Sequence, residues 1–453
     1  MKMKLGLAGA FLALGIAATA HGDAETAAWA PETFTLDNGM EVVVLPDHRA
    51  PVVTHMVWYK VGAVDEAQGK SGIAHLFEHV MFTETDDLPP GEFDSIISRN
   101  GGQLNAFTSW DYTAYFERVA VDRLELMMEL EAERMTDLII NDDPEGPFIS
   151  ERDVVKEERR QRVENNPGSL LFEQVMAALY EGHPYSIPVI GFMDEVSALT
   201  PQDGLDFYTT WYAPEHAILI VAGDVTGEDV LTLAEKTYGQ IPASGIERPD
   251  RGWGPVADLT ESETIVYSDP KVRQPEWDRY YISTSYRQDA DLAYALAVGL
   301  DAMGGGLTSP LYQALVEEQK IAVSASAWNF FSLHDRGLAG LSASPAPGTD
   351  LDTLEAAVMG EIASILEAGL SEEDISRSGR LLAASAIYGL DSQSAMANTY
   401  GRALSTGASI EDVMEAPERF RAVTAEQANA ALRALFVEDQ HHITARLLPE
   451  EGL

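Results

Sequence analysis

The two halves of this chain repeat one local pattern, and this repetition strongly limits how the chain can fold. In the first half, the segment 197–202 reads as a helix start and is followed by a helix and an apolar strand at 217–221. In the second half, 421–426 is followed in the same way by a strand at 442–447. Common helix-start residues are the alternative explanation. The repeated order predicts a duplicated α/β unit.

A segment rich in proline and glycine separates the two halves. Residues 241–262 show no sustained hydrophobic period, which is typical of a linker. The chain has 453 residues, enough for more than one domain. We therefore expect a signal segment at 1–20, a first domain at 21–240, a linker at 241–262 and a second domain at 263–453.

The first twenty residues have the pattern of an export signal. Lys2 and Lys4 precede an apolar run at 5–17, and Ala-Thr-Ala at 18–20 suits a cleavage site. A membrane anchor is the alternative, but the run is short for a bilayer span. This pattern predicts a periplasmic or secreted protein without stable membrane insertion.

Composition excludes several classes of function. The chain has no cysteine, so zinc fingers and thiol chemistry are excluded and any metal must be bound by His, Asp or Glu. Its 30 basic and 73 acidic residues give a formal charge of −43, which repels nucleic acid. Such a surface fits a saline habitat, a preference for neutral or basic peptides, or simple solubility.

The sequence His75-Leu76-Phe77-Glu78-His79 is the strongest chemical motif. Two histidines four residues apart lie on one face of a helix and can bind one metal ion. Glu78 projects near the same point and is suited to accept a proton from water. Ser71 is placed to cap this helix. The inverted His-x-x-Glu-His spacing is a zinc-enzyme motif.

A third ligand is expected on a later charged helix. The segment 150–153 has the form of a capping box, which would open a helix reaching about residue 164. Glu151 and Glu158 lie seven residues apart on that helix and so share one face. Glu158 is the candidate ligand and Glu151 a supporting residue, with a solvated charged helix as the alternative.

The remaining pattern is mixed α and β. A strand, an Asn38-Gly39 turn and a second strand are expected over 34–45, and further strands over 51–61 and 103–119. A helix with buried methionines is expected over 121–140.

The chain resembles the pitrilysin and mitochondrial processing peptidase family of zinc peptidases. The resemblance rests on the Asn38-Gly39 turn and on the segments 72–79, 101–108, 151–158 and 304–309. It implies an α+β chain of two homologous α/β domains, and two chains closing as a clamshell. It also implies one Zn²⁺ per chain on His75, His79 and Glu158, with Glu78 as general base and Glu151 as support.

The same resemblance implies where substrate binds. Asn105, Ala106 and Phe107 would lie on an exposed strand edge that receives an extended peptide, although a plain edge strand has the same pattern.

One departure from the family pattern concerns the second half. Active members usually carry an Arg and a Tyr seven residues apart after the Gly-rich segment, and here Val316 and Val323 stand at those places. Neither valine can donate a side-chain hydrogen bond. Either a homologous partner subunit supplies the Arg and Tyr in a heterodimer, or the chain works weakly alone, with a homodimer also possible. A non-catalytic scaffold and a periplasmic zinc- or peptide-binding protein are the alternatives to a peptidase.

Overall fold

The computed structural model of the chain describes residues 30–249, 251, 254–437 and 440–450. The predicted export signal, 1–20, lies outside these ranges. Within them, no helix combines the length and the apolar character needed to cross a bilayer.

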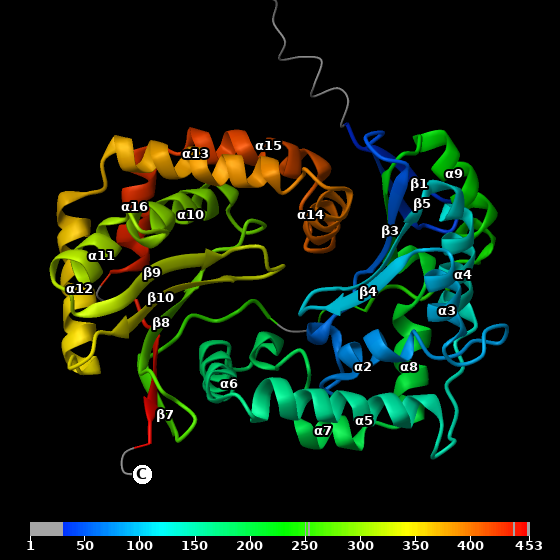
Figure 1. Cartoon of the computed structure of the whole chain (residues 1–453), viewed down its shortest axis with the longest axis horizontal. Coiled ribbons are helices and arrows are strands. Elements are labelled where there is room, and N and C mark those ends of the chain that lie inside the picture. Colours follow the sequence, from blue (N-terminus) through cyan, green and yellow to red (C-terminus); the bar gives the residue numbers. More distant parts are fainter. Residues whose placement is uncertain (1–29, 250, 252–253, 438–439, 451–453) are drawn as a thin grey trace, which may run out of the picture.

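The described residues form two mixed β-sheets, which lie at opposite sides of the view in Figure 1. The first has the strand order β1-β2-β6-β3-β5-β4 and the second β7-β11-β8-β10-β9. The first sheet comprises β1 (Glu32–Thr35), β2 (Glu41–Pro46), β3 (Val52–Tyr59), β4 (Gln103–Thr108), β5 (Thr113–Ala120) and β6 (Ala217–Gly223). The second comprises β7 (Glu263–Asp269), β8 (Glu276–Ser283), β9 (Ala322–Phe330), β10 (Gly337–Pro345) and β11 (Ile443–Pro449).

Apart from β1, the two sheets have the same topology. The pair β2–β6 is parallel, and so is its counterpart β7–β11. The following pairs, from β6 to β4 and from β11 to β9, are all antiparallel. The duplicated α/β unit is therefore confirmed, together with the expected α+β class.

The helices also repeat between the halves. Thr200 caps α8 and Thr424 caps α16, each through a reciprocal capping box. Each helix is followed by a strand of the parallel pair, β6 after α8 and β11 after α16. The helices are α2 (Ile73–Val80), α3 (Glu92–Arg99), α4 (Leu124–Thr136), α5 (Pro147–Arg159), α6 (Pro167–Leu179), α7 (Met193–Ala198), α8 (Pro201–Trp211), α9 (Gly227–Lys236), α10 (Ala290–Gly304), α11 (Pro310–Tyr312), α12 (Leu351–Ala368), α13 (Glu372–Tyr388), α14 (Gln393–Ser405), α15 (Ile410–Ala422) and α16 (Ala425–Leu435). The helix expected over 121–140 is shorter, because a 3₁₀ turn precedes α4 and the helix ends at Thr136.

Two predicted helix starts were wrong. Ser71 does not cap α2, because its hydroxyl accepts a hydrogen bond from the backbone of Phe192 instead. The cap position is Gly72, and the carboxylate of Glu66 accepts from the backbone N–H groups of Gly72 and Ala74. The capping box at 150–153 is also absent, because α5 already begins at Pro147, a residue favoured at the first helical position.

Each sheet is covered on one face by a helix from the other half. Helix α14 packs on β3 and β6, and its Met396, Ala397 and Tyr400 join a core that includes Trp58. Helix α6 packs on β11 and β7. Figure 1 shows α14 beside the first sheet and α6 beneath the second. The exchange buries faces that would otherwise expose apolar side chains.

The segment between the halves is anchored by charge. No helix or strand of the described residues lies between Gln240 and Glu263. Within this segment, Arg251 contacts Asp65 at 2.9 Å and Asp111 at 2.6 Å, both almost fully buried. We propose that 241–262 is the connector between the two domains, held to the first domain at Arg251.

The exchange of α14 can be tested at Gly401. A Cβ atom there would lie 2.0 Å from the indole of Trp58, so Gly401→Ala is expected to lower stability by about 1–3 kcal/mol through overpacking. The matched control is Gly360→Ala in α12, where an added Cβ meets nothing within 4 Å and should stabilise by up to about 1 kcal/mol. Thermal unfolding of both variants measures the difference, and equal melting temperatures would contradict the close packing of α14 against Trp58.

Candidate metal centre

Helix α2 presents three side chains of the inverted motif together. The imidazoles of His75 and His79 have ring centroids 5.2 Å apart. The Glu78 carboxylate lies 4.0 Å from Nε2 of His75. The helix is short, but its start is fixed by Glu66 and its other residues are largely buried. The motif is thus held on one structured turn.

Helix α5 brings two carboxylates to this turn from a distant part of the chain. Oε2 of Glu158 lies 3.6 Å from Nε2 of His75 and 3.3 Å from Nε2 of His79. Oε2 of Glu151 lies 3.4 Å from Nδ1 of His79. In the described part of the chain, His75, His79 and Glu158 are the residues whose potential ligand atoms gather within 4.8 Å of one another.

The three residues fit a zinc ion. Two histidines and one glutamate form a ligand set of catalytic zinc sites, which leave a fourth position open. Ligand bonds near 2.0–2.2 Å place neighbouring tetrahedral ligands about 3.3–3.5 Å apart, close to the separations between Glu158 and the two histidines. Oε2 of Glu158 is buried and makes no hydrogen bond of good geometry to any described residue. A cation would satisfy this atom.

The pKa values of the two histidines at the centre are shifted in opposite directions. Burial lowers the pKa of His75 to about 4. Burial also lowers the pKa of His79, but contacts with Glu151 and Glu158 outweigh it and raise that pKa to about 9. The contact with His79 is the largest effect on Glu158 and lowers its pKa. A bound metal would replace the proton of His79, because a ligating imidazole is neutral.

Glu78 faces the centre without belonging to the ligand group. Its Oε2 accepts a hydrogen bond from Oγ1 of Thr108 at 2.7 Å, and burial raises its pKa. Thr108 is the last residue of β4, so the strand and the carboxylate are directly linked. No sequence pattern predicts this contact, since Thr108 is distant from Glu78 along the chain and threonine is common in strands.

Strand β4 borders a cavity of about 850 Å³ beside the centre. Asn105 and Ala106 line it together with Glu78, His79 and Glu151. β4 is the last strand in the order of its sheet and, within the described residues, pairs only with β5. The cavity wall is strongly acidic and also includes Glu84, Asp94, Asp143 and Glu145. Phe107, the third expected substrate residue, packs its ring against Trp58 and Tyr112.

Arg134 on α4 contacts the residue that follows α2. Its guanidinium is fully buried, donates to the carbonyl of Met81 at 3.4 Å and lies over the ring of Tyr115. It also pairs with Glu131 on the same helix. A buried charge of this kind is tolerated only with such partners, and here they fix the position at which α2 ends.

Arg162 contacts Glu158, and the sequence patterns above did not predict this pair. Its Nη1 lies 2.6 Å from Oε1 of Glu158, the oxygen that faces away from His75 and His79. Opposite charges four residues apart on a helical segment could have indicated this pair. The contact orients the Glu158 carboxylate.

Val316 and Val323 stand where active members of the family that the chain resembles usually have an Arg and a Tyr. Val316 packs partly buried against the second core. Val323 is 50 % exposed on β9, the outer strand of the second sheet. Neither supplies a polar group.

Comparison with known proteins identifies two family matches. Residues 41–192 match the family described as Insulinase (Peptidase family M16), and residues 198–382 match the Peptidase M16 inactive domain. The chain is 32 % identical over 382 residues to the zinc protease PqqE of Helicobacter pylori, covering 82 % of each protein. It is 27 % identical to the probable mitochondrial-processing peptidase subunit beta of Arabidopsis thaliana, covering 83 % of this chain and 71 % of that one.

The fold is similar to that of a solved structure. A crystal structure of a protease from Helicobacter pylori superposes with a TM-score of 0.85 at 29 % identity, covering 93 % of this chain and all of the other.

The choice of Glu158 over its neighbour can be tested by metal binding. Glu158→Gln is expected to raise the dissociation constant for zinc by more than about 100-fold, because it removes a charged ligand. Glu157→Gln is the matched control, since Glu157 is exposed and contacts only Arg160 and Gln161 among the described residues. Competition with a chromophoric chelator measures both constants. Equal zinc affinity in the two variants would exclude Glu158 as a ligand.

Proposed function

Since the chain belongs to the M16 family of peptidases, we propose that it is a zinc-dependent endopeptidase subunit that hydrolyses short or unfolded peptides. The observation that carries this proposal is the convergence of His75, His79 and Glu158 within 4.8 Å, with Glu78 beside them.

One zinc ion per chain would be held by His75, His79 and Glu158, with Glu151 orienting the imidazole of His79 from its other nitrogen. When bound, zinc supplies Lewis acidity, which activates water and polarises a peptide carbonyl.

Glu78 is the general base of this proposal. It accepts a proton from the attacking water and passes that proton to the leaving amine. Burial raises its pKa and so brings the carboxyl closer to the range in which it can both accept and return a proton. Thr108 fixes one carboxylate oxygen and leaves the other available.

The outer edge of β4 is the proposed substrate platform. An extended peptide can add to this edge through backbone hydrogen bonds, and Asn105, Ala106 and Phe107 would carry them. Because the backbone supplies these contacts, they are compatible with many sequences. The acidic cavity beside the edge favours neutral or basic peptides over acidic ones.

The proposed active site also needs a homologous partner subunit. Val316 and Val323 offer no polar group, so we propose a heterodimer whose second chain supplies an Arg and a Tyr, the two chains closing as a clamshell around a chamber. The pattern at 1–20 supports a periplasmic or secreted location, and the net charge of −43 argues against nucleic acid as a partner.

The general base is tested with Glu78→Gln. This variant should keep stoichiometric zinc but lose at least about 100-fold in kcat/KM on an unstructured peptide, because amide nitrogen cannot accept the proton. Metal analysis and a fluorogenic peptide assay give the two readouts. Glu129→Gln, an exposed change on α4, is the control. Undiminished cleavage by Glu78→Gln would contradict the mechanism.

The partner is tested by comparing the chain alone with a mixture. Alone, the zinc-loaded chain should be weakly active, and a homologous chain with Arg and Tyr at the equivalent positions should raise kcat/KM by at least about 100-fold. Light scattering should show a heterodimer. Full activity of a homodimer would show that no such partner is needed.

A non-catalytic scaffold is the second candidate, favoured only by the two valines. Zinc analysis separates it from the peptidase: a mature chain that stays substoichiometric in zinc after reconstitution would support the scaffold.

A further inference from the structure

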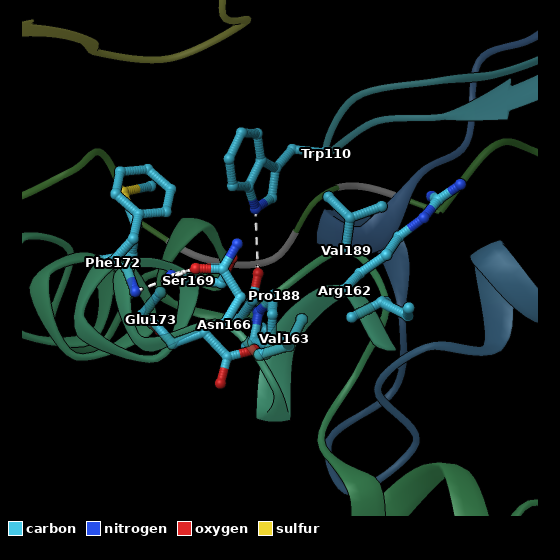
Figure 2. A pocket seen from close by; sticks show the side chains of 14 residues that line it. Trp110, Arg162, Val163, Asn166, Ser169, Phe172, Glu173, Pro188 and Val189 are labelled. Atoms are coloured by element: carbon cyan, nitrogen blue, oxygen red, sulfur yellow. Dashed lines mark hydrogen bonds between the residues drawn. The ribbon is translucent and has the colours of Figure 1, made fainter. Parts of the chain in front are cut away.

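A second cavity, of about 540 Å³, lies next to the candidate metal centre. Its walls come from the turn after β4, the start of α6 and the segment 186–190 (Figure 2). A volume of this size accommodates one large side chain with room to spare.

The walls are largely apolar. Trp110, Val163, Phe172, Met176 and Val189 contribute side chains to the cavity. The one polar atom of the Trp110 indole is already used, because Nε1 donates to the carbonyl of Ile187 at 3.0 Å. Figure 2 shows this hydrogen bond, with Phe172 bordering the same hollow.

Both charged residues that line the cavity have partners. Glu173 forms two hydrogen bonds with the buried guanidinium of Arg159, at 2.7 and 3.0 Å. Arg162 pairs with Glu158 at 2.6 Å. The cavity therefore offers apolar surface and no uncommitted charge, so an aliphatic or aromatic group gains more there than a charged one.

The cavity is joined to the centre on two sides. On one side, Arg162 contacts the candidate ligand Glu158. On the other, Thr108 contacts Glu78 and Trp110 follows two residues later. Trp110 lies in the turn between β4 and β5, just past the end of β4, so a peptide that lies along β4 and continues past Thr108 would run toward the cavity.

We propose that this cavity is a specificity subsite, which takes an apolar or aromatic side chain of the peptide on one side of the cleaved bond. The proposal rests on the proposed peptidase function. It adds a sequence preference that backbone pairing at β4 alone does not create.

The test changes the charge of the cavity at Ser169, which lines it at the third residue of α6. A glutamate suits this helix position, so Ser169→Glu should fold, and Ser169→Gln is the uncharged control of the same shape.

Zinc-loaded wild-type chain is incubated with a peptide mixture randomised on both sides of the cleaved bond. Mass spectrometry of the products should show at least about tenfold preference for Phe, Tyr, Leu or Met over Asp, Glu and Lys at one position.

In Ser169→Glu the preference at that position should shift to Lys and Arg, and in Ser169→Gln it should stay apolar. Cleavage without a preference there, or a preference that Ser169→Glu leaves unchanged, would overturn the subsite.

A binding assay separates this proposal from hydrolysis itself. Labelled peptides with Phe or Lys at the selected position are titrated with the Glu78→Gln variant, followed by fluorescence anisotropy. About tenfold tighter binding of the Phe peptide, reversed by adding Ser169→Glu, supports the subsite even if no peptide is hydrolysed. Equal binding of the two peptides overturns it.

Discussion

Both sheets of this protein are apolar on both faces, and each half of the chain covers only one face of its own sheet. The other face is covered by α14 for the first sheet and by α6 for the second. This exchange fixes how the halves lie against each other, because a sheet face left in water would expose residues such as Trp58 and Ile220. The connector at Arg251 adds buried ion pairs to an arrangement that packing already determines.

The candidate metal centre depends on the same exchange. Helix α5, which carries Glu158, continues through a π-helical turn (Arg160–Glu164) that includes Arg162, and α6 follows directly. The segment that leaves the centre is thus the segment that docks on the second sheet. Meanwhile Glu66 fixes the start of α2, and Arg134 contacts the residue after its end. The side chains of the candidate centre are therefore positioned from both sides, an arrangement that would favour tight and selective coordination of a metal ion.

Sequence patterns predicted those parts of the fold and site that depend on local spacing. The strands around Asn38-Gly39, the repeated helix and strand near the end of each half, and the helical pairing of His75 with His79 all follow from short-range rules. Spacing alone made Glu158 a candidate ligand with a solvated charged helix as the alternative, and only the family resemblance implied it as a ligand. The contacts of Thr108 with Glu78 and of Glu66 with the start of α2 could not be predicted, since they are made by side chains from other elements. The helix exchange was missed for the same reason.

The exchanged helix α14 also has a consequence for the order of folding. The first sheet is formed by residues before 224, yet one of its faces stays uncovered until residues 393–405 have been synthesised. The native contacts of that face therefore span more than 170 residues of chain, and such distant contacts form slowly. A chain of this design cannot complete its first domain during synthesis of that domain. It remains incompletely folded until nearly its whole length is available.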